Sequence, residues 1–318
     1  MFTDYFRITA TAVGQIFILA AIGYFLVKKN ILGSQGLDAL SRLVVEITLP
    51  LMIFCKLLKD FTFAKYPGWW VFPLASILIT ACGFLIGGIF SIFFKGRQHK
   101  LQFLGLVAFQ NSGYLPLGLI TALLSKEQAD QMFIYLFLIL MGFNLLVWSL
   151  GVYLLTFHRS RKFELGSLFS PPVAATVFTL VLIFFSLNRF IPDFLYKPLK
   201  AVGDCTVPLA LFIVGGSLAL VELKKVDKKA VVFLILAKNL ILPAAGFLVL
   251  LAFNIRGLIG LLIMMQLAMP SATTLSLIIR HYKKEDLFIS QGVFFSHLAG
   301  VITIPVFLSL YFALSMIK

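Results

Sequence analysis

Long apolar runs separated by short charged segments dominate the chain. Runs of about 20 apolar residues are long enough to cross a bilayer as helices. The pattern predicts ten spans, at 8–27, 37–58, 68–94, 101–124, 131–156, 171–190, 196–222, 230–253, 257–280 and 288–316. The connections are short, and the longest hydrophilic one runs from His158 to Ser170. The predicted fold is therefore an all-α membrane protein whose functional site lies inside the helix bundle.

Composition excludes the water-soluble class. Of the 318 residues 60% are hydrophobic and only 13% are charged, and the mean hydropathy is +1.01. A soluble domain carries roughly 25% charged residues and has too little interior to bury this much apolar surface.

The net charge of +14 is distributed in a way that predicts topology rather than a nucleic-acid partner. Lys and Arg lie in short loops beside the spans, and more of them occur on the side reached after the first span. By the positive-inside rule that side faces the cytoplasm. The sequence therefore predicts a multi-pass protein of the plasma membrane with both termini extracytoplasmic.

Motifs for metals, cofactors and catalysis are missing from the sequence. Cys55, Cys82 and Cys205 all fall within predicted spans and show no metal-ligand or disulfide spacing. No phosphate-binding glycine loop accompanies the chain, so a nucleotide-driven pump is not expected. We predict no cofactor, no metal and no enzymatic activity.

The second and seventh predicted spans share one pattern, an acidic residue, a threonine and a Pro-Leu pair at matched spacing. Its members are Glu46, Thr48, Pro50 and Leu51 in one span and Asp204, Thr206, Pro208 and Leu209 in the other. The two copies are offset by five spans, and because five is odd the second copy enters the membrane in the opposite sense. The pattern predicts two inverted five-helix repeats, 1–156 and 171–318, joined by a cytoplasmic linker at 157–170.

The fourth and ninth spans share a weaker sequence similarity. Residues 110–118 and 266–274 each place amides, hydroxyls, small residues and a proline at mid-membrane depth. Proline removes a backbone hydrogen bond, and unwound backbone is tolerated in a membrane only where it is buried in protein or lines a cavity. We predict that both helices are broken, at Pro116 and Pro270, and that they form the binding site.

Polar residues inside the spans are the candidate substrate ligands. An Asn amide both donates and accepts, and a half-helix N-terminus offers free N–H groups to a carboxylate. The candidates are Asn111, Ser112, Gln266, Ser271, Thr273, Thr48, Thr206, Asn144 and Lys238.

The ionisable residues of the spans leave alternatives open. Arg42 with Glu46, and Lys200 with Asp204, have the i,i+4 spacing of intrahelical ion pairs, but each acid is also a candidate for substrate contact or proton coupling. Lys238 either snorkels to the interface, pairs internally, or points inward as a charge for an anion or a stand-in for a bound cation. Like Asn144, His297 is a candidate for a hydrogen bond across helices.

Several segments together resemble the auxin efflux carrier family, which includes plant PIN-type auxin exporters and bacterial malate or malonate permeases. They are Leu49–Phe54, Asn111–Tyr114, Val207–Leu218, Ala268–Ala272 and Ile302–Pro305. The resemblance runs in order along the whole chain. The order Pro116-Leu117-Gly118 reverses the usual Gly-x-Pro of the family, so the fourth-span break is expected slightly earlier. The long loop of the plant exporters is absent.

The resemblance implies a fold related to the bile acid transporters and sodium/proton antiporters. Spans 1, 2, 6 and 7 would form a scaffold, and spans 3–5 and 8–10 a transport domain that moves like an elevator in a homodimer. The fourth and ninth helices would cross at Pro116 and Pro270, with Asn111 as the crossover Asn near the substrate carboxylate.

The leading functional hypothesis is a secondary transporter that exports a small organic anion, such as a carboxylate or an auxin-like acid. The alternative is a sodium-coupled symporter of the bile acid type, which the lack of Asp and Glu in the crossover stretches disfavours. An intramembrane enzyme using Glu46 and Asp204 lacks a catalytic motif, and a receptor lacks an output domain.

Overall fold

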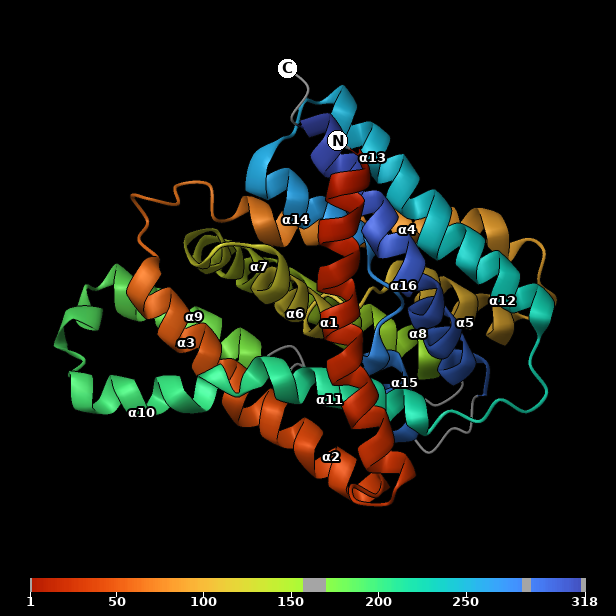
Figure 1. The fold of residues 1–318 in the computed structure, drawn as a ribbon, viewed down its shortest axis with the longest axis horizontal. Coiled ribbons are helices and arrows are strands. Elements are labelled where there is room, and N and C mark those ends of the chain that lie inside the picture. Colours follow the sequence, from red (N-terminus) through yellow and green to blue (C-terminus); the bar gives the residue numbers. More distant parts are fainter. Residues whose placement is uncertain (1, 157–169, 282–286, 316–318) are drawn as a thin grey trace.

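The computed structural model describes residues 2–156, 170–281 and 287–315, and in these ranges every regular element is a helix (Figure 1). The helices are α1 (Phe2–Lys28), α2 (Ser34–Leu43), α3 (Leu49–Asp60), α4 (Val71–Ser91), α5 (Arg97–Ala108), α6 (Tyr114–Leu123), α7 (Lys126–Leu146), α8 (Val152–Thr156), α9 (Pro171–Phe184), α10 (Asp193–Asp204), α11 (Thr206–Ala219), α12 (Lys228–Leu234), α13 (Leu242–Ala252), α14 (Gly257–Ala268), α15 (Thr273–His281) and α16 (Leu287–Ser315). The all-α prediction holds for this part of the chain. Of the predicted linker, only Ser170 lies inside it.

Six helical stretches of the described chain are long and apolar enough to cross a membrane. They are Phe2–Lys28, Val71–Ser91, Lys126–Leu155, Asp193–Ala219, Lys228–Ala252 and Leu287–Leu314. The predicted span 37–58 also lies in one continuous helical stretch, from α2 through α3. The apolar helices α6, α9 and α14 are shorter.

Within the described ranges, three helical stretches contain a π-helical segment, at Val44–Thr48, Val147–Gly151 and Ile235–Ile241. The wider π turn disturbs the regular i to i−4 bonding and is frequent at functional sites. Glu46 and Lys238, two ionisable residues of the predicted spans, lie in such segments.

The predicted span 171–190 is wrong at its C-terminal end. The helix α9 stops at Phe184, and Ser186 adopts a left-handed conformation with φ of 58° before a short 3₁₀ turn at Leu187–Phe190. A helix cannot continue through a left-handed residue. The 14 residues of α9 span about 21 Å, less than the hydrocarbon thickness of about 30 Å.

The helix α1 passes through the middle of the molecule, with α3, α9 and α10 on one side of it and α12 and α13 on the other (Figure 1). It packs against α11 at backbone contact distance, because Gly23 faces Phe212 and Gly215 faces Ala20. Small residues permit such close approach between membrane helices.

The start of α1 lies beside the end of α16. The Thr9 hydroxyl and the Ser309 hydroxyl are 2.6 Å apart, and the rings of Tyr5 and Phe312 stack at 5.8 Å. The first and last helices therefore run antiparallel, and these two helix ends lie on the same side of the molecule.

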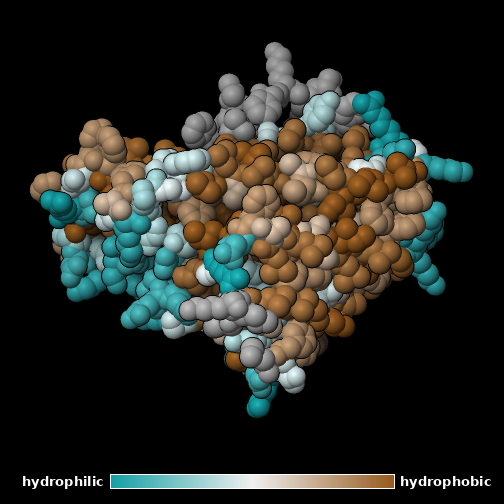
Figure 2. Space-filling model, turned by 90° about the horizontal axis from the view of Figure 1, so that it is seen from above, coloured by the Kyte–Doolittle hydropathy of each residue, from teal (hydrophilic) through white to brown (hydrophobic). Residues whose placement is uncertain are grey.

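The outer surface is apolar over much of its area, and brown residues cover most of the face seen in Figure 2. Large exposed side chains include Phe178, Phe184, Phe185, Phe190 and Phe194, the last two about four-fifths exposed at 81% and 79%. Contiguous apolar surface of this kind is unstable against water but matches lipid chains. The surface and the apolar helices define a multi-pass membrane protein.

Candidate functional site at the crossing of two broken helices

Two helices are interrupted, between α5 and α6 at 109–113 and between α14 and α15 at 269–272, and the two extended breaks run antiparallel to each other. Gln110 and Ser271 form a β-bridge. Two backbone hydrogen bonds join the breaks, from the Asn111 amide to the Pro270 carbonyl at 2.8 Å and from the Ala272 amide to the Phe109 carbonyl at 2.9 Å. Both interruptions that the sequence predicted are present, and they meet.

The two prolines occupy different positions relative to their breaks. Pro270 lies within 269–272, whereas Pro116 lies in the first turn of α6, after the break. In the first turn of a helix the backbone N–H has no intrahelical partner, so proline costs little there. The break before α6 is therefore earlier than Pro116, in the direction that the reversed Pro-Leu-Gly order indicated.

The carbonyls exposed by the breaks find partners from other elements. The Ser271 hydroxyl donates to the Leu106 carbonyl at 2.7 Å, and the Lys238 ammonium donates to the Val107 carbonyl at 2.9 Å. The Gln266 amide donates to the Ser112 carbonyl at 3.1 Å. Since an unpaired carbonyl in lipid costs several kcal/mol, these side chains make the unwound backbone tolerable.

Asn111 is held in place by α16. Its side-chain nitrogen lies 3.3 Å from Nε2 of His297, and Nδ1 of His297 lies 2.8 Å from the Val293 carbonyl. A carbonyl only accepts, so Nδ1 carries the hydrogen and Nε2 accepts from Asn111. The cross-helix bond expected of His297 is thus present, and it leaves the Asn111 carboxamide oxygen outside this contact.

A second connection runs from the π segment through α16 to the other break. The Asn239 amide donates to the Ser296 carbonyl at 3.0 Å, and the Ser296 hydroxyl accepts from the Ser271 backbone N–H at 3.1 Å. Neither Asn239 nor Ser296 is among the ligands predicted from the sequence, because nothing in their local pattern marks them. Only the packing of α16 brings them to the break.

Several buried polar atoms at the crossing have no hydrogen-bond partner among the residues that the structure describes. They are both side-chain amide atoms of Gln110, the Ser112 hydroxyl, Oε1 of Gln266 and Oδ1 of Asn239. All four residues are at most 1% exposed. A buried polar group without a partner is costly, so such a group points to a ligand or to water. Gln110 was not among our predicted ligands, although it lies inside the predicted polar stretch.

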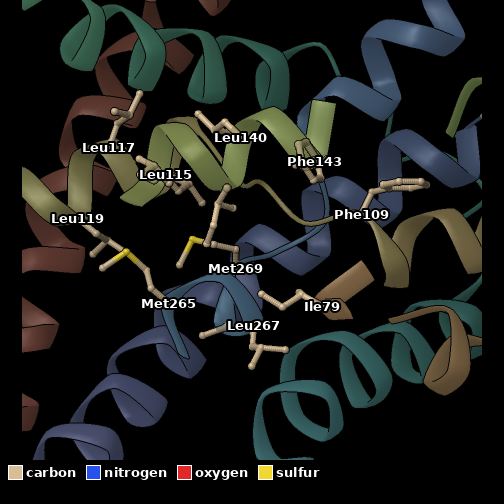
Figure 3. Packing of buried hydrophobic residues seen from close by; sticks show 14 of the residues in the cluster. Ile79, Phe109, Leu115, Leu117, Leu119, Leu140, Phe143, Met265, Leu267 and Met269 are labelled. Carbon is tan, nitrogen blue, oxygen red and sulfur yellow. The ribbon is translucent and has the colours of Figure 1, made fainter. Parts of the chain in front are cut away.

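Apolar side chains enclose the crossing. Figure 3 shows Leu115 of α6 beside Met269 of the break and Leu119 of α6 beside Met265 of α14, and all four side chains are 0% exposed. A low-dielectric enclosure strengthens every hydrogen bond made inside it. The crossing is closed to solvent in this conformation.

The remaining predicted ligands lie in varied surroundings. Thr48 and Thr206 are buried, and both hydroxyls lack a hydrogen-bond partner within residues 2–156, 170–281 and 287–315. Thr273 begins α15 and is 2% exposed, whereas Asn144 of α7 is only half-buried. The structure therefore brings Asn111, Ser112, Gln266, Ser271 and Lys238 together but does not join the other four to them by a hydrogen bond in its described part.

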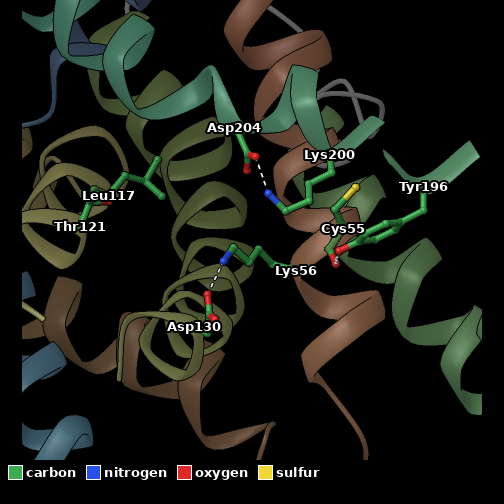
Figure 4. Close-up of polar contacts among 8 residues, drawn as sticks. All are labelled: Cys55, Lys56, Leu117, Thr121, Asp130, Tyr196, Lys200 and Asp204. Carbon is green, nitrogen blue, oxygen red and sulfur yellow. Dashed lines mark hydrogen bonds and ion pairs between the residues drawn. The ribbon is translucent and has the colours of Figure 1, made fainter. Parts of the chain in front are cut away.

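The predicted ion pairs differ between the two halves. Lys200 pairs with Asp204, as Figure 4 shows, and both side chains are about half exposed. Arg42 and Glu46 are both exposed, and no ion pair joins them in the described chain. The wider π turn at Val44–Thr48 changes the spacing that would align these two residues. The intrahelical pairing predicted for Arg42 and Glu46 is wrong for this conformation.

Snorkelling of Lys238 to the interface is also wrong. Its side chain is 0% exposed and reaches inward to the C-terminus of α5. The π segment places it on the inner side of the bundle, where a carbonyl is available as acceptor.

These features define a polytopic helical membrane protein with a buried polar crossing at its centre. The chain belongs to the membrane transport protein family, the auxin efflux carrier family indicated by its sequence, and matches the family over residues 8–166 and 155–308.

The chain is similar to two curated proteins, one archaeal and one from a plant. An uncharacterized transporter of the archaeon Methanocaldococcus jannaschii is 27% identical over 294 residues, which cover 88% of this chain and 91% of that protein. Protein PIN-LIKES 6 of Arabidopsis thaliana is 29% identical over 120 residues, covering 37% of this chain and 28% of the plant protein.

Proposed function

We propose that the chain is a secondary transporter that exports a small organic anion, a carboxylate or an auxin-like acid, through a site at the helix crossing. The observation that carries the proposal is the set of partnerless polar atoms beside the first turn of α6, above all the carboxamide of Gln110 and the hydroxyl of Ser112. Family membership supports a transport function for this site.

The electrostatics of the crossing favour an anion. The helices α6 and α15 both begin there, and helix N-termini carry a partial positive charge and free N–H groups. Lys238 adds a buried cation, and neither break contains Asp or Glu. A carboxylate would therefore meet donors and positive potential, with Asn111, Ser112, Gln266 and Ser271 as its nearest polar neighbours and Thr273 at the start of α15.

Alternating access is the mechanism that we propose for this site. A buried site needs a conformational change to reach either side of the membrane. In our proposal, two inverted five-helix repeats, 1–156 and 171–318, supply two groups of helices. The scaffold consists of α1–α3 and α9–α11, and the elevator of α4–α8 and α12–α16. The glycine-mediated contact of α1 with α11 supports a rigid scaffold.

We also propose that the protein is a homodimer in the plasma membrane and that its termini are extracytoplasmic.

Thr48, Thr206 and Asn144 enter the proposal at a different stage. The unpaired hydroxyls of Thr48 and Thr206 occupy equivalent positions of the two predicted repeats, and both belong to the scaffold group. We propose that they contact the substrate only when the elevator brings the crossing past them. Glu46 and Asp204 stay candidates for proton coupling.

The proposal is tested with purified protein in liposomes and a panel of radiolabelled carboxylates, with and without proton and sodium gradients. We expect uptake of at least one small carboxylate without a sodium requirement. Removing a hydrogen bond to a charged group typically costs about 1.5–3 kcal/mol, so Asn111→Ala lowers the substrate affinity by roughly tenfold to a hundredfold. Unchanged affinity in a folded Asn111→Ala protein rejects the site, and a panel with no transported acid rejects the substrate class.

A further inference from the structure

Lys238 is a buried cation without a carboxylate partner in the described chain. Its side chain is 0% exposed, and its hydrogen bond joins Nζ to the Val107 carbonyl at 2.9 Å. A buried charge is normally paired with an opposite charge or solvated by several polar groups. The opposite charge at this place is the C-terminal end of α5, which stops at Ala108, one residue after Val107.

The end of a helix in the middle of a bundle creates a local negative potential. The last carbonyls of a helix have no intrahelical donors and carry a partial negative charge. At the end of α5, the Leu106 carbonyl accepts a hydrogen bond from the Ser271 hydroxyl, and the Val107 carbonyl accepts one from the Lys238 ammonium. The first partner is neutral and the second is charged, so only Lys238 neutralises the helix end.

The neighbour of Lys238 ties the same π segment to the second break. Asn239 donates to Ser296, and Ser296 in turn accepts from the Ser271 backbone. Two consecutive residues of the π segment therefore hold both interrupted helices, one through a charge and one through a chain of neutral hydrogen bonds.

We propose that Lys238 acts as a covalently attached cation that occupies the place of a dissociable metal cation at the end of α5, so that the crossing keeps its geometry without a bound ion. A free cation coordinated by backbone carbonyls would neutralise the same helix end but would have to be supplied by the solution. With the ammonium tethered, the crossing is complete at any sodium concentration. Transport through the crossing is then independent of sodium. This consequence rests on the proposed function, whereas the positioning role of Lys238 does not.

The test measures the melting temperature of the purified full-length protein in sodium chloride, propylammonium chloride and choline chloride at equal ionic strength. Wild-type protein should melt at the same temperature in all three salts. Lys238→Ala should melt roughly 5 °C lower in choline, as expected for the loss of a buried charged hydrogen bond in a chain of this size. Sodium or propylammonium, which fit the space left by the side chain, should restore at least half of that loss.

Two further variants separate charge from packing. Lys238→Met fills the space without charge, so we expect it to stay destabilised in every salt. Lys197→Met removes an exposed lysine of α10 that pairs with Asp193, and we expect it to melt like wild type. A Lys238→Ala protein that no cation restores, a Lys238→Met protein as stable as wild type, or a wild-type protein stabilised by sodium overturns the proposal. If Lys238→Ala does not fold, the stability of Lys238→Met and the effect of sodium on the wild-type protein still test the proposal.

The liposome assay then tests the consequence for coupling. Substrate uptake by wild-type protein should have the same rate in sodium and in choline. A sodium-dependent rate overturns the inference, whereas the absence of any carboxylate transport rejects the proposed function and leaves the melting experiment to decide the role of Lys238.

Discussion

The backbone amide of Asn111 donates a 2.8 Å hydrogen bond to the carbonyl of Pro270, and this bond ties the break in the first half of the chain to the break in the second. The return bond between Ala272 and Phe109 makes the two breaks a short antiparallel pair. Because each break satisfies the other, neither broken helix can move alone without losing buried hydrogen bonds. We therefore expect the crossing to move as one body.

Replacing Gln110 separates a binding role from a structural one. Both of its side-chain amide atoms are buried and have no partner in the described part of the chain, so Gln110→Leu removes a desolvation cost and should leave the melting temperature unchanged or higher. Substrate affinity should fall by about tenfold or more, since the hydrogen bonds to the anion are lost. Thermal melting and a binding isotherm on the same protein measure both quantities.

Tyr66→Phe is the matched control for Gln110→Leu. The Tyr66 hydroxyl is also buried and has no partner among the described residues, but the Tyr66 ring stacks on Phe61 in the segment before α4. Substrate affinity should be unaffected. A Gln110→Leu protein that binds substrate as wild type does would contradict the assignment of this carboxamide to the site.

Ser271 should be mainly structural, although its sequence position marks it as a ligand. Its hydroxyl donates to the Leu106 carbonyl at 2.7 Å, so Ser271→Ala leaves that buried carbonyl without this partner. The free energy of unfolding should fall by about 1–2 kcal/mol, and substrate affinity should change less than in Asn111→Ala. A large loss of affinity at unchanged stability would instead assign the hydroxyl to the substrate.

The contact between α1 and α11 tolerates no side chain at Gly215. A Cβ atom there would lie 1.6 Å from the Ala20 carbonyl oxygen, so Gly215→Leu must push the two helices apart. Overpacking of this kind costs about 1–3 kcal/mol or more, and we expect a large loss of folded protein in size-exclusion chromatography. Gly14→Ala on α1 is the control, because its Cβ would meet no atom within 4 Å and alanine favours the helix.

An ion pair connects the two groups of helices that the elevator proposal separates. Lys56 of α3 pairs with Asp130 of α7, as Figure 4 shows, and both side chains are about a quarter exposed. If the groups slide past each other, this pair must break in every cycle. In a cysteine-free background, cross-linking Lys56→Cys to Asp130→Cys should abolish transport, and reduction should restore it.

The matched control links two positions of one helix. Cysteines at Asp193 and Lys197 of α10 have i,i+4 spacing and are exposed, so their cross-link should leave the transport rate unchanged. Full activity of the protein linked between α3 and α7 would show that these two helices do not move relative to each other.

The sequence indicated the membrane class and most helix positions because burial in lipid demands long apolar runs and intrahelical hydrogen bonds. The error at α9 shows the limit of this rule. The predicted span ran on to Phe190 because Phe185, Leu187 and Phe190 are apolar, but the left-handed Ser186 ends the helix before them, and hydropathy carries no information about a single backbone angle.

Only part of the candidate site could be predicted from the sequence. Proline and clustered polar residues marked the two breaks, because both oppose a regular helix in lipid. Gln110 lies in the same stretch as Asn111, yet only the tertiary structure distinguishes a side chain whose amide is partnerless from one held by His297.

By itself the sequence determined that the chain is a membrane protein, that two of its helices are interrupted, and that it belongs with the auxin efflux carriers. These three conclusions follow from local composition and from sequence motifs. The tertiary structure alone decided that the breaks pair with each other and that Lys238 turns inward to the end of α5. Those outcomes depend on which distant carbonyl or side chain packing brings within hydrogen-bond reach, and local sequence does not encode that distance.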